Sequence, residues 1–122
     1  MTSGEGVPVV YDSVGRDTFD GSIECLTPRG CMVLYGQSSG FVPPINPQVL
    51  MAKGSLFLTR PSLGSYTQTR DELDWRSSDL FEWVGTGRLS IRVGGRFALS
   101  EAAEAHRRLE GRATTGKVVL IP

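Results

Sequence analysis

The sequence lacks a Gly-rich phosphate-binding turn, a long apolar run and a cluster of metal-ligating residues. No G-x-G-x-x-G stands ahead of the first strand-like segment, so a common pyrophosphate-binding element is missing. No apolar run approaches the length of a membrane span. The two cysteines, Cys25 and Cys31, have neither C-x-x-C nor zinc-site spacing. We therefore expect no metal site and no disulfide, with both cysteines acting as small, partly buried apolar residues.

The chain also lacks an excess of either charge. Its 122 residues carry 13 basic and 13 acidic side chains, with no basic block, so nucleic acid and an anionic membrane are not expected partners. The polar, Gly-rich first residues have neither the basic start nor the apolar stretch of a signal peptide, which favours a cytoplasmic location. The length fits one domain over residues 1–122.

The first sixty residues have the pattern of a β-α-β unit. Residues 7–14 are rich in β-branched side chains and lie between two glycines, which is typical of a buried central strand. Residues 16–29 place Phe19, Ile23 and Leu26 on one helical face, and Pro28 and Gly30 end that pattern. A short apolar strand follows at residues 31–35. The connection is long enough for a parallel crossover.

The remaining chain continues the alternation of helices and strands. A short helix to Lys53 and a strand over residues 55–59 come first. Thr69 and Glu72 form a predicted capping box for a helix that ends near Gly87. We then expect a strand over residues 89–93, a helix capped by Ser100 and a strand over residues 118–121. This order predicts an α/β fold with a largely parallel sheet.

The ends of the predicted strands are the candidate binding positions, because open parallel sheets bind ligands outside their carboxyl ends. The best candidate is the loop 36–39, in which Gly36 permits close approach of a ligand to the backbone, and Gln37, Ser38 and Ser39 supply donors and acceptors. The simpler interpretation is a plain turn after a strand, and the pattern alone favours that turn.

Other polar residues have both a functional and a structural interpretation. Asp12 could bind ribose or act in catalysis, but a role in fixing the turn before Gly15 is favoured. The single histidine, His106, is expected to be a hydrogen-bonded core residue, and Trp75 and Trp83 to cover a core or an interface. Arg112 could contact phosphate, but without other information we expect an exposed side chain.

Several segments together resemble one family over essentially the whole chain. The segments are VVYDSVG at residues 9–15, GSLFLTRP at 54–61, AAEAHR at 102–107 and GKVVLIP at 116–122. They look like the C-terminal portion of bacterial NADPH:quinone oxidoreductases, the zeta-crystallin-like, zinc-independent branch of the medium-chain dehydrogenases/reductases. The resemblance implies a partial Rossmann-like parallel sheet with flanking helices, without the N-terminal GroES-like substrate domain and without the Gly-rich turn.

The resemblance also implies different roles for the two parts of the chain. Residues 7–60 would be the second half of a Rossmann fold, and residues 61–122 would return to the substrate domain. No catalytic residue is expected, because the family transfers hydride directly from NADPH to a quinone. The residues implied to contact NADPH are Val14, Gly36, Gln37, Ser38, Ser39, Phe57, Leu58, Thr59, Arg60 and Arg112.

The missing turn leads to two expectations about the chain by itself. Because the element that holds the pyrophosphate is absent, we expect weak or undetectable NADPH binding and no turnover. The resemblance also implies a homodimer through the edge strand at residues 55–59. The alternative function is a non-enzymatic dimerisation or partner-binding module that keeps the fold. A weaker third possibility is a stand-alone enzyme that uses Asp12 or His106.

Overall fold

The computed structural model describes residues 2–122 and divides into two compact units. The first ends at Gln68 and the second begins at Thr69. The expected change of role between residues 60 and 61 stays a prediction. The prediction that residues 1–122 form one domain stays a prediction, and each unit is described here by itself.

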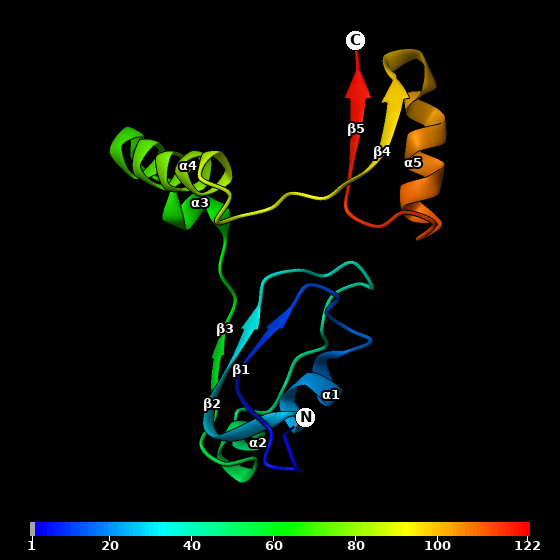
Figure 1. Cartoon of the computed structure of the whole chain (residues 1–122). Coiled ribbons are helices and arrows are strands. Elements are labelled where there is room, and N and C mark those ends of the chain that lie inside the picture. Colours follow the sequence, from blue (N-terminus) through cyan, green and yellow to red (C-terminus); the bar gives the residue numbers. More distant parts are fainter. Residues whose placement is uncertain (1) are drawn as a thin grey trace. The chain divides into compact units, whose positions relative to one another are not determined.

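The first unit contains a parallel sheet of three strands (Figure 1). Strands β1 (Val7–Asp12), β2 (Leu26–Leu34) and β3 (Phe57–Thr59) lie side by side in that order and run in the same direction. Val9 pairs with Cys31, and Cys31 pairs with Phe57. The predicted parallel arrangement of the opening three strands is therefore confirmed, and their carboxyl ends meet at one edge of the sheet.

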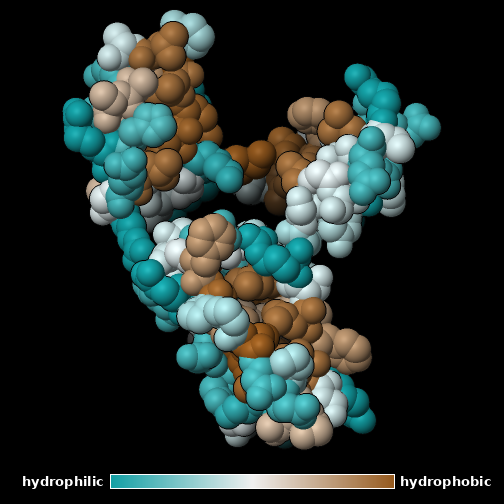
Figure 2. Space-filling view, turned by 180° about the vertical axis from the view of Figure 1, so that it is seen from behind, coloured by the Kyte–Doolittle hydropathy of each residue, from teal (hydrophilic) through white to brown (hydrophobic). Residues whose placement is uncertain are grey.

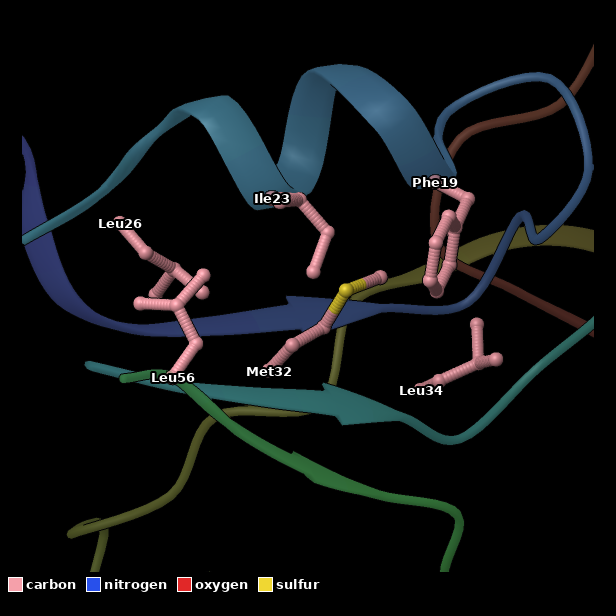
Figure 3. Packing of buried hydrophobic residues seen from close by; sticks show 6 residues of the cluster. All are labelled: Phe19, Ile23, Leu26, Met32, Leu34 and Leu56. Carbon is pink, nitrogen blue, oxygen red and sulfur yellow. The ribbon is translucent and has the colours of Figure 1, made fainter. Parts of the chain in front are cut away.

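The core of this unit lies between the sheet and helix α1 (Phe19–Glu24), as Figure 3 shows. Phe19 and Ile23 point from the helix toward Met32 and Leu34 of the central strand, and Met32 is completely buried. Leu26 and Leu56 complete the cluster. Burying side chains of this size contributes about 1.5–3 kcal/mol each, so these six residues provide the main support for the strand ends.

Helix α1 is shorter than the predicted helix over residues 16–29. The amide of Val7 donates to the carbonyl of Cys25 at 2.8 Å, and Leu26 pairs with Val7 as the first residue of β2. The sheet therefore takes up the backbone groups that a longer helix would need. Arg29 has a positive φ of 64°, which marks an irregularity in the strand after Pro28. Helix α2 (Gln48–Ala52) ends before Lys53, and α3 (Leu63–Tyr66) follows β3.

The second unit begins with helix α4 (Arg70–Gly85), whose predicted capping box is confirmed. The Thr69 hydroxyl accepts the amide of Glu72, and the Glu72 carboxylate accepts the amide of Thr69, both at 3.2 Å. These two bonds satisfy amide groups that have no partner within the helix. The apolar side chains of this helix are largely exposed, with Leu73, Leu80 and Phe81 at 46%, 49% and 77%.

A second β-α-β unit closes the chain. Strand β4 (Val93–Ala98) pairs in parallel with β5 (Lys117–Ile121), and helix α5 (Ala102–Glu110) connects them after the 3-10 helix η1 (Leu99–Glu101). The strand predicted over residues 89–93 is therefore displaced toward the C-terminus. Ser100 is not the cap of α5, since it lies within η1, and the Glu101 carboxylate accepts the Ala98 amide at 2.9 Å.

Within residues 2–68, helix α1 packs on one face of the three-stranded sheet. Val10, Met32 and Leu58 face the core, so the alternating residues face the other way. Of these, Val9, Tyr11 and Phe57 are 41%, 73% and 62% exposed. Within residues 2–68 no helix packs on this face, and apolar residues reach the surface of both units (Figure 2).

The two cysteines differ in their exposure to solvent. Cys25 is exposed, which differs from the expected partial burial, whereas Cys31 is half-buried on the open face of the sheet. Both thiols are free. Along residues 2–122, none of the helices combines the length and the apolarity needed to cross a bilayer.

Candidate functional site

Two loops meet at the carboxyl ends of β1 and β2. The Ser38 amide donates to the carbonyl of Ser13 at 3.3 Å, and the Ser39 amide donates to the carbonyl of Val14 at 2.9 Å. The Ser39 hydroxyl also donates to the carbonyl of Val14, at 2.7 Å. The structure therefore brings Val14 and the loop 36–39 together at this edge of the sheet.

Gly36 has a structural reason to be glycine. A Cβ atom at this position would lie 2.6 Å from the Cα atom of Ser13 and 2.7 Å from its carbonyl carbon. The amide of Gly36 donates to the carbonyl of Asp12 at 3.2 Å. Residue 36 must therefore be glycine because the backbone of Ser13 occupies the space of a side chain. This reason differs from the close approach of a ligand that the sequence suggested.

Strand β3 brings a third chain segment to this edge of the sheet. The guanidinium Nη2 of Arg60 donates to Oε1 of Gln37 at 3.2 Å. Both side chains are exposed, so the bond adds little stability. It does place a positive charge and an amide next to each other, and this pair is suited to a ligand with oxygen acceptors.

Asp12 lies beneath the loops and is almost fully buried, at 4% exposed. One carboxylate oxygen accepts the amides of Val14 and Gly15 at 2.8 and 2.9 Å. The other accepts the hydroxyls of Thr18 and Ser22, both at 2.7 Å. The turn-fixing role predicted for Asp12 is therefore confirmed, and the carboxylate is fully engaged within the chain.

These contacts also set the charge of Asp12. Burial alone raises the pKa of a carboxyl group, but hydrogen bonds from Gly15, Ser22, Thr18 and Val14 favour the ionised form more strongly. The pKa of Asp12 is lowered to about 2. The group is therefore a fixed negative charge at neutral pH and a poor general acid or base.

The predicted binding residues differ in how accessible they are. Gln37, Ser38, Thr59 and Arg60 are exposed, whereas Gly36 and Ser39 are half-buried. Leu58 packs against the core, and Phe57 is exposed on the open face of the sheet. The loop is thus not buried in packing. That these residues contact NADPH stays a prediction.

The remaining singled-out residues lie in the second unit. Arg112 follows α5 with an exposed side chain and a positive φ of 54°. His106 is exposed on α5, so the prediction of a core histidine is wrong. Helix α5 covers only two strands and buries only Ala105. Trp75 is 60% exposed, and the Arg76 guanidinium lies 4.7 Å from its ring centre.

Sequence reasoning missed the residues that support the site from below. The amide of Asp17 donates to the Ser39 hydroxyl at 3.0 Å, and Thr18 and Ser22 donate to Asp12. Thr18 is the residue before α1, and Ser22 lies four residues later within the helix, so the two hydroxyls lie on the same side. That spacing, after an aspartate at the end of a strand, is the signal that could have identified them.

The structure offers no ligand set for a metal ion. Over residues 2–122, no group of three or more His, Cys, Asp or Glu side chains could hold one. Zinc sites need at least three protein ligands of these types.

Comparison with known proteins identifies one family. A family described as zinc-binding dehydrogenase matches residues 1–120. The chain is 48% identical over 122 residues to a quinone oxidoreductase of Pseudomonas aeruginosa, and 48% identical over 124 residues to quinone oxidoreductase 1 of Escherichia coli. It is 47% identical over 123 residues to a 2-haloacrylate reductase of a Burkholderia species. Each of these alignments covers the whole chain.

Solved structures similar to this chain belong to the same kind of protein. The Escherichia coli quinone oxidoreductase complexed with NADPH has a TM-score of 0.91 at 48% identity, and a mycobacterial protein complexed with NADPH has a TM-score of 0.93 at 48% identity. The alignments cover 99% of this chain, but 38% and 37% of those chains. The chain spans about 38% of the length of the first two curated relatives, and it matches only the C-terminal part of the neighbouring structures.

Proposed function

The chain belongs to the zinc-binding dehydrogenase family, and from this premise we propose that it is the cofactor-binding C-terminal part of an NADPH-dependent quinone reductase. The observation that carries the proposal is 48% identity to quinone oxidoreductases across the entire chain. It is supported by the close match to the Escherichia coli enzyme complexed with NADPH. When bound, NADPH supplies the hydride that reduces the quinone.

The residues of the first unit would contribute binding and orientation. Gln37 and Ser38 offer an amide and a hydroxyl at the exposed carboxyl edge of the sheet, and Arg60 offers a positive charge beside them. This chemistry suits the amide and ribose oxygens of a nicotinamide nucleotide. Orientation of the two reactants can lower a barrier substantially without an acid or base residue, and the engaged, ionised Asp12 is consistent with such a mechanism.

The chain by itself is proposed to be inactive. A Gly-rich turn followed by a helix N-terminus, which usually holds the pyrophosphate, is absent from its sequence. Binding would then rest on a few exposed polar contacts. We expect weak or undetectable NADPH binding and no hydride transfer from the isolated chain.

An NADPH titration followed by backbone amide shifts tests the binding proposal. We expect shifts at Val14, Gln37 and Ser38 only at high NADPH concentration, and Gln37→Ala should reduce them. Gln48→Ala is the matched control, because Gln48 is exposed on α2 and belongs to no proposed contact. Shifts confined to the second unit would contradict the proposed site. A dissociation constant of about 10 μM or tighter by calorimetry would contradict weak binding.

A homodimer through β3 is the second part of the proposal. Phe57–Thr59 pairs with β2 on one side only, so its other edge has unpaired backbone groups within residues 2–68. Such an edge is a ready template for pairing with another chain. The alternative function, a non-enzymatic dimerisation or partner-binding module, is favoured by the same edge and by the exposed residues Val9, Tyr11 and Phe57. Binding of NADPH at the loops would distinguish the enzyme part from this module.

A further inference from the structure

The hydroxyl of Ser39 is used within the chain. It donates to the carbonyl of Val14 at 2.7 Å and accepts the amide of Asp17 at 3.0 Å. The amide of Ser39 adds a second bond to the same Val14 carbonyl at 2.9 Å. Three hydrogen bonds therefore connect Ser39 to the segment after β1. Ser39 holds the two loops together, and its hydroxyl proton is not free for a ligand.

The segment that Ser39 binds is itself held by Asp12. The Asp12 carboxylate accepts the amides of Val14 and Gly15, so the peptide groups on both sides of Val14 are restrained. It also accepts the hydroxyls of Thr18 and Ser22 from α1 and the residue before it. One buried carboxylate thus connects the end of β1 to α1 and, through Val14, reaches Ser39. Hydrogen bonds to a charged acceptor are shorter and stronger than neutral ones.

We propose that Asp12 is a positioning residue for the candidate site, acting through Val14 and Ser39 to hold the loop 36–39 in its binding geometry. The proposal rests on the proposed function for the identity of the site. Asp12 touches no ligand in this role. It leaves Gln37 and Ser38 exposed and held in place as ligand contacts, and such preorganisation determines how well a site binds.

A purely local role for Asp12 makes a different prediction. If the carboxylate only shaped the turn, its loss would affect Val14 and Gly15 and stop there. If it positions the loop through Val14, the effect must also reach Ser39, Gln37 and Ser38 on the next strand end. Residues that share one hydrogen-bond network show non-additive responses when two of them are changed together.

The test uses amide hydrogen exchange and amide shifts of the free chain. In Asp12→Asn we expect the exchange rate of the Ser39 amide to rise about tenfold, with shifts at Gln37 and Ser38. Asp20→Asn is the matched control, because Asp20 is an exposed carboxylate on α1, and it should leave these signals unchanged. An unchanged Ser39 exchange rate in a folded Asp12→Asn variant would overturn the proposal.

A double substitution tests the route. Ser39→Ala removes two of the three hydrogen bonds that join the loops, so adding Asp12→Asn to it should shift Gln37 and Ser38 less than Asp12→Asn does in the wild-type chain. Fully additive shifts would overturn the proposal. If Asp12→Asn does not fold, Ser22→Ala removes one donor to the same carboxylate and should give a smaller effect in the same direction. No change at Ser39 in that variant would also count against the proposal.

The outcome is separable from that of the NADPH titration because no ligand is present. Faster exchange at Ser39, combined with NADPH-induced shifts confined to the second unit of the wild-type chain, would support the Asp12 route and contradict the proposed site. Unchanged exchange at Ser39, combined with NADPH-induced shifts at Gln37 and Ser38, would overturn the Asp12 route and support the proposed function.

Discussion

A Cβ atom placed on Gly36 would lie 2.6 Å from the Cα atom of Ser13, so these two loops can meet only where residue 36 has no side chain. The contact is with backbone atoms, which cannot move aside as a flexible side chain could. The two loops therefore depend on each other for their conformation, and their mutual fit can be tested by a single methyl group.

Gly36→Ala is expected to destabilise the first unit by about 1–3 kcal/mol, the usual cost of forcing an extra carbon into a packed site. Gly21→Ala is the control, because a Cβ there meets no atom within 4 Å and Gly21 lies in α1. That control should be neutral or stabilising, by up to about 1 kcal/mol. Urea unfolding followed by far-ultraviolet circular dichroism compares the two. Equal free energies of unfolding for both variants would show that the loops can move apart without destabilising the unit, which would contradict this prediction.

Lowering the pH should destabilise the folded first unit, because the Asp12 carboxylate becomes protonated. Its pKa in the folded chain is about 2, below the ordinary value of 3.8, so the unfolded chain binds the proton more readily. The stabilisation is complete above about pH 4 and is lost as the pH falls toward 2. Unfolding measured across this range should show a steeper loss for the wild type than for Asp12→Asn. Parallel pH profiles for the two chains would contradict the assignment.

The capping box at α4 gives a prediction for the second unit. Thr69→Ala removes the acceptor of the Glu72 amide, and we expect a loss of about 1 kcal/mol in helix stability. Ser78→Ala is the control, because Ser78 is exposed within the same helix and alanine favours helix there. Far-ultraviolet circular dichroism against temperature measures both. A Thr69→Ala chain as helical as the wild type at every temperature would speak against the cap.

The proposed dimer can be tested at Phe57. Phe57→Lys places a charge on the short edge strand, which should prevent pairing of two edges while leaving the fold intact, because Phe57 is 62% exposed. Phe41→Lys makes the same change at a residue that is 78% exposed and lies outside the strands. Light scattering should show a monomer for the first variant and a dimer for the second. A wild-type chain that is already monomeric would contradict the dimer itself.

The exposed hydrogen bond between Arg60 and Gln37 leads to a prediction about ligand binding rather than stability. Arg60→Ala removes the bond to Gln37, and both side chains are in water, so stability should change by less than about 0.5 kcal/mol. The NADPH-induced amide shift at Gln37 should become weaker, because the neighbouring positive charge is lost. Arg29→Ala, which removes another exposed arginine of this unit, should leave that shift unchanged. Equal shifts in both variants would contradict a binding role for Arg60.

The parts of the fold that the sequence predicts best are those with strong local chemistry. The β-branched run before Asp12 predicts a central parallel strand, and the Thr69–Glu72 pair predicts a helix start; both are confirmed. The role of Asp12 in the turn also followed from its place just before Gly15. In each case the deciding interactions lie within a few residues along the chain, where sequence patterns carry most of their information.

The sequence-based predictions are wrong where contacts between residues far apart in the chain determine the structure. The sequence predicts a strand over residues 89–93, yet β4 extends through Gly94 and Gly95, residues that rarely favour strands. Pairing with β5 sets the position of that strand, and a Cβ at Gly94 would collide with the backbone of Thr115. Likewise, helical spacing placed His106 on an apolar face, but a two-stranded sheet is too narrow to bury it. The link from Asp12 to Ser39 depends on a loop 25 residues beyond Val14.

The open face of the three-stranded sheet has a consequence for handling the isolated polypeptide. Parallel sheets are normally covered on both sides, whereas here Val9, Tyr11 and Phe57 form an outward layer that meets water. Such a layer should attract apolar dyes and mild detergents while the chain is still folded, and these amphiphiles should raise its melting temperature at low concentration by mass action. Dye fluorescence, which usually reports partly unfolded material, would in this chain come from the native state.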